Sequence, residues 1–221
     1  MCGRFTLTCL GEQLAEIFQL SEVPEITPRY NIAPTQLVAT VSINSKSEKR
    51  QLNWMRWGLI PSWAKDQKMG AKLINARVET VAEKPSFRQA IRQRRCLIVA
   101  DGFYEWQKIE DQKQPYYLHV ENHQPFGFAG LWERWKSPEN EEIISCTILT
   151  TEANNEVRSI HHRQPIIIPE NNYSQWLDPQ LTEPQEILPL LTSQPPLNYY
   201  PVNAVVNNSR HDQADCIEQK G

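Results

Sequence analysis

Short apolar runs separated by polar or proline-containing turns dominate the chain. Residues 37–43 and 51–57 are rich in β-branched and aromatic side chains, and the polar stretch between them predicts a hairpin. Residues 96–100 form a continuous apolar run, as buried strands do. Further strands are predicted over residues 115–120, 126–132, 143–151, 165–168 and 199–206. Strands therefore dominate the middle of the chain.

Helical spacing of apolar side chains is limited to short segments. Residues 59–78 are irregular, and a long irregular loop in a compact domain usually has a function. The pattern predicts an α+β fold with a mainly antiparallel, barrel-like sheet decorated by short helices. We expect one domain over residues 1–221, with 207–221 as a C-terminal tail. Helices are predicted over residues 12–20, 79–94 with an interruption at Pro85, 152–160, 169–178 and 183–192.

Charge is distributed unevenly along the chain. The net charge of the 221 residues is −3, yet residues 1–100 carry 15 Lys and Arg against 8 Asp and Glu, whereas residues 101–221 carry 8 against 18. A basic face built from the first half can therefore bind an anion despite the overall balance. No segment has the pattern of a signal peptide or a membrane span. We expect a cytoplasmic protein, nucleoid-associated if bacterial, that has no membrane association and is a monomer.

Cysteine content and known motifs exclude several function classes. The five cysteines are odd in number and form no CxxC pair, which argues against a disulfide framework or a structural zinc site. Around His161 and His162 no HxxxH or HxH spacing supports a metal, and we predict no metal and no other cofactor. The chain lacks a Walker A loop, a GxGxxG loop and a GxSxG elbow, so nucleotide hydrolysis, dinucleotide binding and α/β-hydrolase chemistry lose support.

Cys2 is the most informative residue of the sequence. Removal of Met1 would leave an α-amine and a thiol on one residue, and such a 1,2-aminothiol condenses with an aldehyde to an imine and then to a thiazolidine. The amine titrates near about 8 and the thiol near about 8.5, so both have a reactive fraction at neutral pH. The alternative is a buried structural cysteine.

Two polar positions in aromatic or basic surroundings are candidates for proton transfer. Glu105 lies between Tyr104 and Trp106, and burial there would raise its pKa and allow general acid catalysis. The alternative is an exposed glutamate at a strand edge. His161 precedes His162 and Arg163 and suits proton transfer near neutral pH, unless it is a surface histidine.

Aromatic and basic residues suitable for single-stranded nucleic acid occur among the same segments. Trp63 and Trp106 can stack on bases, and the guanidinium groups of Arg4, Arg29 and Arg77 can hold phosphates. Most of the seven tryptophans are expected in the core, with one or two exposed.

Taken together, these segments resemble the SOS-response-associated peptidase (SRAP) family. The matching pieces are MCGRF, RYNIAP, WGLIPSW, LINARVET, ADGFYEW, IHHRQP and PVNAVV, which follow the family's order from residue 2 to about 206. The resemblance implies a barrel-like α+β fold with a positively charged channel for single-stranded DNA. It also implies a covalent crosslink to abasic sites through the N-terminal cysteine.

The resemblance also assigns roles to individual residues. Cys2 would form the crosslink, Asn31 would orient the substrate or the N-terminus, and Glu105 and His161 would transfer protons. DNA phosphates around the lesion would be held by Arg4, Asn75 and Arg77. Neighbours in the channel would be Pro34, Trp63, Trp106 and Thr150.

This sequence departs from the family pattern at two places. Trp63 is followed by Ala64, where some members have a second tryptophan, which puts DNA affinity in question. His162 and Gln164 stand where an acidic residue and a methionine also occur, and His162 can alter the proton behaviour of His161.

Two other functions remain open from the sequence. One is a thiol autopeptidase, in which Cys2 with His161 as base removes a short leader. The other is a non-covalent binder of single-stranded DNA, which uses only arginine and tryptophan contacts. Partners at a replication fork are not indicated by any residue pattern.

Overall fold

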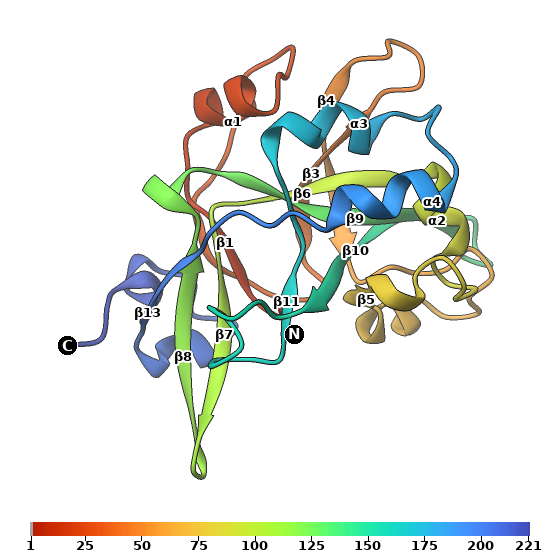
Figure 1. Cartoon of the computed structure of the whole chain (residues 1–221). Helices are drawn as coiled ribbons and strands as arrows, with labels where there is room; N and C mark the ends of the chain where they lie inside the picture. Colours follow the sequence, from red (N-terminus) through yellow and green to blue (C-terminus); the bar gives the residue numbers. More distant parts are fainter. Residues whose placement is uncertain (1) are drawn as a thin grey trace.

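Two connected sheets with short peripheral helices form the molecule (Figure 1). The computed structural model describes residues 2–221, so Met1 and the prediction of its removal lie outside the described residues. The strands are β1 Phe5–Leu7, β2 Arg29–Ile32, β3 Leu37–Ile43, β4 Arg50–Trp57, β5 Asn75–Arg77, β6 Arg95–Ala100, β7 Gly102–Ile109, β8 Gln112–His119, β9 Phe126–Lys136, β10 Glu142–Glu152, β11 Arg163–Pro165, β12 Ile167–Ile168 and β13 Asn198–Pro201. The α-helices are α1 Gly11–Ile17, α2 Arg88–Gln93, α3 Tyr173–Leu177 and α4 Pro184–Ile187. The remaining helical segments are 3₁₀ turns, at Gln67–Lys72, Val78–Thr80, Glu121–His123, Glu170–Asn172, Leu188–Leu191, Ala204–Asn207 and Ala214–Ile217.

The larger sheet closes into a barrel. Its strands follow the order β10–β4–β3–β6–β9, and β9 pairs again with β10. Only the β10–β4 pairing within this ring is parallel. Every residue of β6 is buried, as expected for a strand with packed side chains on both faces. The prediction of an α+β fold with a mainly antiparallel, barrel-like sheet is therefore confirmed.

A smaller sheet lies against the barrel in the order β13–β8–β7–β1–β2. The two sheets are joined where β6 runs into β7 with only Asp101 between them. Asp101 is 3% exposed and accepts hydrogen bonds from the Thr6 hydroxyl at 2.5 Å and the Thr8 hydroxyl at 2.8 Å. Its carboxylate also accepts from the backbone amides of Thr8 and Cys9. One buried carboxylate thus fixes the N-terminal strand to the junction of the sheets.

Gly102 allows close packing beside this junction. A Cβ atom at position 102 would lie 2.1 Å from the Tyr117 hydroxyl group, far inside van der Waals contact. The Tyr117 hydroxyl is also 3.1 Å from the Thr6 hydroxyl. The glycine of the ADGFYEW segment is therefore needed for the tyrosine to reach β1.

Local predictions differ from the structure in several places. Residues 155–160 form turns instead of a helix: the Asn154 side chain accepts from the Val157 amide, but the segment is too short to offset the cost of helix nucleation. The last strand ends at Pro201, and Ala204–Asn207 is a 3₁₀ turn. The sequence pattern did not predict β1, β2, β5 or β7 as strands. Among the described residues, no helix is long and apolar enough to cross a membrane.

Candidate functional site

The first residues of the chain run along β7 toward Glu105. Phe5 pairs with Phe103, and the Tyr104 amide donates to the Arg4 carbonyl at 3.0 Å. This antiparallel register places residues 2–4 beside the segment that follows Tyr104. Cys2 is fully buried, and the Asn75 side-chain amide donates to its carbonyl oxygen at 2.8 Å. Cys2 is therefore held between β7 and the start of β5.

Glu105 is a buried neighbour of Cys2. Its side chain is 2% exposed, and burial raises the pKa of Glu105 to about 7. Burial also raises the pKa of the Cys2 thiol, and the nearby Glu105 charge raises it further. The thiol is consequently protonated at neutral pH, whereas the carboxyl group is poised to give or accept a proton.

His161 lies on the loop that leads into β11, and this loop contacts β7. The Gln107 side-chain amide donates to the Ser159 carbonyl at 2.9 Å, and Gln107 lies on the same face of β7 as Glu105 because side chains alternate along a strand. His161 is half-buried, and burial lowers its pKa, so its imidazole is neutral near pH 7. This loop brings a neutral imidazole to the same end of β7.

The backbone of Arg163 can support either neutral form of the His161 ring. Nδ1 of His161 is 3.0 Å from the Arg163 carbonyl oxygen and 3.0 Å from the Arg163 amide nitrogen. When Nδ1 carries the proton, it donates to the carbonyl group and Nε2 is a base. When Nδ1 accepts from the amide, Nε2 carries the proton and can donate it. Such a residue suits proton transfer in both directions.

Asn31 is the centre of a buried network behind the site. Its Oδ1 accepts a hydrogen bond from the Arg4 guanidinium at 3.0 Å. Its Nδ2 donates to the carbonyl groups of Val206, Asn208 and His211 at 3.1, 3.0 and 2.7 Å. Arg4 also donates to the Val206 carbonyl at 2.9 Å. Asn31 thus positions Arg4, two residues from Cys2, and ties it to the C-terminal segment.

Asp212 extends this network and was missed by the sequence reasoning. Its carboxylate accepts from the backbone amides of Tyr30 and Asn31 at 2.5 and 2.8 Å and forms an ion pair with Arg29. Residues 203–217 therefore pack against β2. Sequence reasoning missed Asp212 because an aspartate in a polar stretch near the C-terminus predicts only a solvated surface.

A second buried group supports the other side of Cys2. Thr150 on β10 is fully buried and donates to the Ala76 carbonyl of β5 at 3.4 Å. Arg163 donates to the Thr150 carbonyl at 2.8 Å and forms a two-pronged ion pair with Glu79 at 2.6 and 3.0 Å. The ion pair lowers the pKa of Glu79. Thr150 thus contributes to the frame that holds β5 and Asn75.

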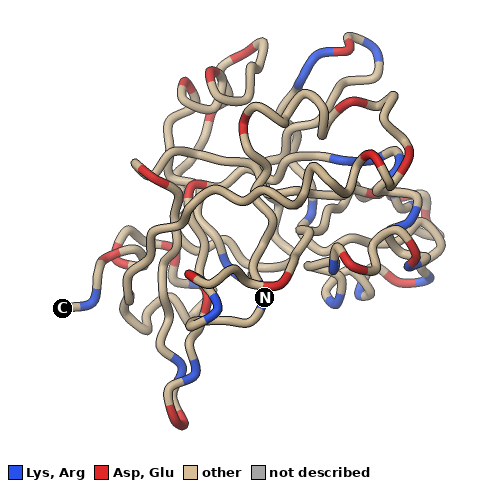
Figure 2. Tube along the Cα trace, in the orientation of Figure 1, with Lys and Arg blue, Asp and Glu red and all other residues tan. Residues whose placement is uncertain are grey.

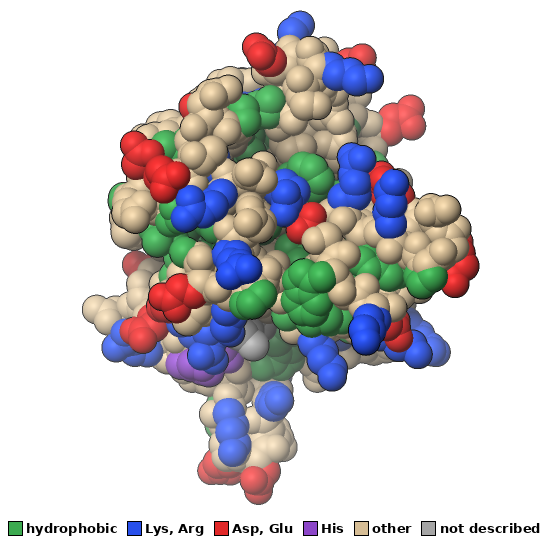
Figure 3. Space-filling view, turned by 90° about the vertical axis from the view of Figure 1, so that its right-hand side faces the viewer, with side chains coloured by type: hydrophobic (Ala, Val, Ile, Leu, Met, Phe, Trp, Pro, Cys, Tyr) green, Lys and Arg blue, Asp and Glu red, His purple; other side chains and the backbone are tan. Residues whose placement is uncertain are grey.

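Basic side chains gather on the face that contains β5. Figure 2 shows Lys and Arg positions, with Asp and Glu among them, along the segment around β5, and Figure 3 shows many basic side chains across this face with several acidic ones between them. Arg77 is exposed there. A cavity of about 460 Å³ is lined by Arg77, Glu152, Arg158, His162 and Arg163. This face has the charge expected for a surface that binds an anionic chain.

The remaining candidate residues vary in exposure. Trp63 is 56% exposed, as a stacking residue requires. Trp106 and Pro34 are half-buried, and the Trp106 indole donates to the Asn207 side chain at 2.7 Å. Ala64 is buried and its carbonyl accepts from the Trp135 indole at 2.7 Å. Of residues 63 and 64, only Trp63 therefore exposes its side chain for stacking.

His162 and Gln164, the two other departures from the family pattern, differ in their exposure. His162 is exposed at the basic cavity and stacks on His161 with ring centroids 4.4 Å apart. Gln164 is 1% exposed and accepts from the Asn154 amide at 2.9 Å. His162 is thus placed to influence His161, whereas Gln164 shapes the preceding turn.

Fold and site together define a class of protein. It is a barrel-like α+β protein with a cysteine at its second residue beside a titrating carboxyl group, and with a neutral imidazole on a loop that contacts the strand of that carboxyl group. The family model described as SOS response associated peptidase (SRAP) matches residues 1–209, and the chain belongs to this family.

Similar proteins support this assignment along the whole chain. The chain is 42% identical over 226 residues to the abasic site processing protein YoqW of Bacillus subtilis (strain 168), with 99% of each chain covered. It is 32% identical over 206 residues to the abasic site processing protein HMCES of Pongo abelii, which covers 79% of this chain and 58% of HMCES. A crystal structure of a protein from Bacteroides thetaiotaomicron superposes with a TM-score of 0.86 at 25% identity, covering 99% of this chain and 100% of that chain.

Proposed function

We propose that this chain processes abasic sites in single-stranded DNA by forming a covalent thiazolidine crosslink through Cys2 after removal of Met1. The observation that carries the proposal is the placement of Cys2 beside Glu105, with Asn75 bonded to the Cys2 carbonyl. The names of YoqW and HMCES support abasic sites as the substrate class. The reaction would shield the lesion with protein.

The first step joins the amine to the sugar aldehyde. An abasic site exposes an aldehyde in its ring-opened form, and the α-amine of Cys2 attacks that carbon. A C–N bond forms, the carbonyl oxygen leaves as water, and an imine remains. Glu105 supplies the proton to the departing hydroxyl, because a carboxyl group with a pKa of about 7 is substantially protonated at neutral pH.

The second step closes the ring. The Cys2 thiol adds across the imine, so that a C–S bond forms and the thiol proton ends on nitrogen. Neutral His161 can relay this proton, since its pKa is lowered. Both nucleophiles belong to one residue, so their effective concentration is high and ring closure is favoured. The net change is the loss of one water, and the product is a stable crosslink.

Binding of the DNA strand is assigned to the basic face. Arg77 is exposed for phosphate contact and Trp63 for stacking on a base. Arg4 and Asn75, by contrast, use part of their hydrogen-bonding capacity to hold the N-terminal segment. We therefore assign these two residues to positioning Cys2 near the lesion.

The test compares Cys2→Ala with Cys9→Ser in a single-turnover assay with a single-stranded oligonucleotide that carries one abasic site. We expect Cys2→Ala to lose the crosslink that survives boiling in detergent and Cys9→Ser to retain it. Cys2→Ala keeps the amine, so strand cleavage through the imine can persist. A boiling-resistant crosslink of normal yield in Cys2→Ala contradicts the proposal.

A leader-cleavage assay separates this function from the autopeptidase. A fusion with a short peptide before Cys2 is incubated alone and its termini are sequenced. Cleavage that depends on Cys2, together with no adduct on abasic DNA, would favour the peptidase over the crosslinking function.

A further inference from the structure

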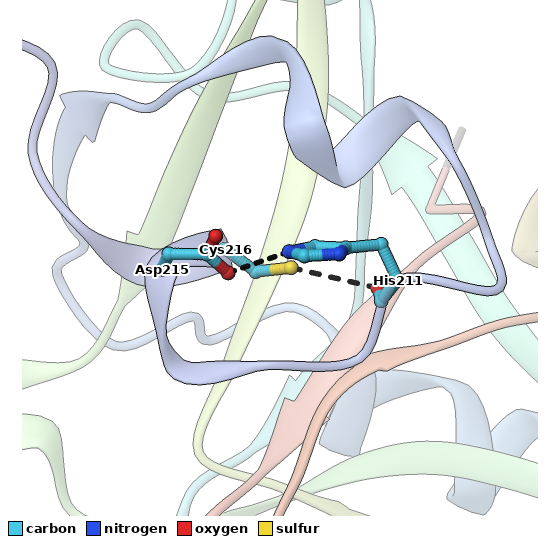
Figure 4. A group of neighbouring side chains, drawn as sticks. All are labelled: His211, Asp215 and Cys216. Atoms are coloured by element: carbon cyan, nitrogen blue, oxygen red, sulfur yellow. Dashed lines mark hydrogen bonds and ion pairs between the residues drawn. The ribbon is translucent and has the colours of Figure 1, made fainter.

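Three potential metal ligands meet in the C-terminal segment, away from Cys2. Figure 4 shows the side chains of His211, Asp215 and Cys216 pointing toward one another, and their ligand atoms all lie within 4.8 Å of each other. We propose that these three residues bind a thiophilic divalent cation of the Zn²⁺ type. This proposal is independent of the crosslinking function.

The distances require only a small adjustment of the side chains. Nε2 of His211 is 2.7 Å from Oδ1 of Asp215, and the Cys216 thiol donates to the His211 carbonyl at 3.6 Å. Tetrahedral zinc with bonds of about 2.0–2.3 Å separates its ligand atoms by roughly 3.3–3.8 Å. The imidazole and carboxylate must therefore move apart slightly, and the thiol must turn from the carbonyl toward the ion.

The ligand set matches the chemistry of zinc. Sulfur, imidazole nitrogen and carboxylate oxygen are its usual donors, and three protein ligands leave one position for water. Binding forms a metal–sulfur bond and releases the thiol proton to solvent. The thiolate and the Asp215 carboxylate then balance the two positive charges of the ion.

The surrounding charges are compatible with this balance. The Cys216 thiol is buried, and the charged groups around it are Asp212, Asp215 and Arg4. A metal centre without net charge does not repel the Arg4 guanidinium. His211 and Asp215 are partly exposed and Cys216 is buried, so an ion can enter from the solvent side.

The position of the cluster gives the ion a structural consequence. The His211 carbonyl accepts the 2.7 Å hydrogen bond from Asn31, and the next residue, Asp212, holds the backbone of β2. A bound ion would link residues 211 and 216 and thus stabilise the segment that positions Arg4.

The test uses reduced full-length protein titrated with Co²⁺, followed by displacement with Zn²⁺. We expect one equivalent of Co²⁺ to give sulfur-to-metal charge transfer and tetrahedral visible absorption, both removed by one equivalent of Zn²⁺. The thermal midpoint should rise with Zn²⁺ concentration. Cys216→Ser should abolish the charge-transfer band, and His211→Ala and Asp215→Asn should weaken binding at least tenfold.

Two control variants distinguish this cluster from the other thiols. Cys2→Ala and Cys9→Ser should bind Co²⁺ as the unaltered chain does. Absence of a one-to-one absorption band overturns the proposal, as does a band that persists in both Cys216→Ser and His211→Ala. The variants at the partly exposed positions 211 and 215 test the site even if the variant at the buried Cys216 does not fold.

Discussion

At the scale of single residues, opposite pKa shifts define the roles in the site. Burial raises the pKa of Glu105 to about 7 and lowers that of His161, so one group is a partly protonated acid and the other is a neutral base near pH 7. The sequence predicted Cys2 from its position after Met1 and Glu105 and His161 from their neighbours, and the family resemblance assigned their roles. It could not show that Asn75 bonds to Cys2 or that Asp212 bonds to β2, because these contacts join distant segments.

Glu105→Gln tests the acid role through the pH dependence of crosslinking. The unaltered protein should lose rate as pH rises above about 7, where Glu105 loses its proton, and as pH falls and the Cys2 amine is protonated. The variant should lack the high-pH decline and react at least about 100-fold more slowly at neutral pH. Single-turnover rates across pH measure this, with DNA affinity as the control. An unchanged rate and profile would remove Glu105 from the mechanism.

The same residue makes stability depend on pH. The folded protein holds the Glu105 proton more tightly than the unfolded chain does. The contribution of Glu105 to the free energy of unfolding is therefore greatest below the ordinary glutamate pKa and is lost as pH rises to about 7. Relative to Glu105→Gln, the unaltered protein should therefore lose roughly 3 kcal/mol of unfolding free energy between pH 4.5 and 7. Urea denaturation at several pH values measures the difference, and a constant difference across this range would contradict the assignment.

At the scale of elements, the register of β1 on β7 decides where Cys2 lies. The hairpin β3–β4 and the buried strand β6 could be predicted because apolar and β-branched runs with clear turns specify them. β1, β2 and β7 could not, because they are short or rich in polar and aromatic residues. They are stabilised by distant partners such as Asp101, which sequence periodicity does not contain.

Asp101→Asn tests the attachment of β1. An asparagine side chain offers one acceptor oxygen and turns an NH₂ group toward the amides of Thr8 and Cys9, both of which donate. We expect a loss of about 1–3 kcal/mol in unfolding free energy and slower crosslinking. Chemical denaturation measures the first effect, with Asp111→Asn on the exposed β7–β8 turn as the control. Equal stability of the two variants would place the β1 anchor elsewhere.

At the scale of the whole molecule, residues from both ends of the sequence form one structure. Arg4 from the basic first half bonds to Asn31 and to the Val206 carbonyl in the acidic second half. The barrel-like α+β class was predictable from strand content and spacing. The joining of Cys2, β5, β7 and the C-terminal segment was not, because it depends on the pairing of β5 with β10 and on hydrogen bonds between residues far apart in the sequence.

Arg77→Ala tests the basic face as the DNA surface. Loss of one phosphate contact should weaken binding of single-stranded DNA and reduce the slope of log affinity against log salt by about one. Fluorescence anisotropy at several salt concentrations measures both quantities. Lys49→Ala on the exposed β3–β4 turn is the control and should leave the slope unchanged. An unaltered slope in Arg77→Ala would place Arg77 away from the phosphates.

Intact mass spectrometry tests the central claim most directly. Purified protein is measured before and after incubation with a single-stranded oligonucleotide that carries one abasic site. We predict a chain without Met1 that gains the mass of the oligonucleotide minus one water, with the adduct mapped to Cys2. A chain that lacks Met1 and gains no mass, or an adduct mapped to another residue, would contradict the proposed crosslink.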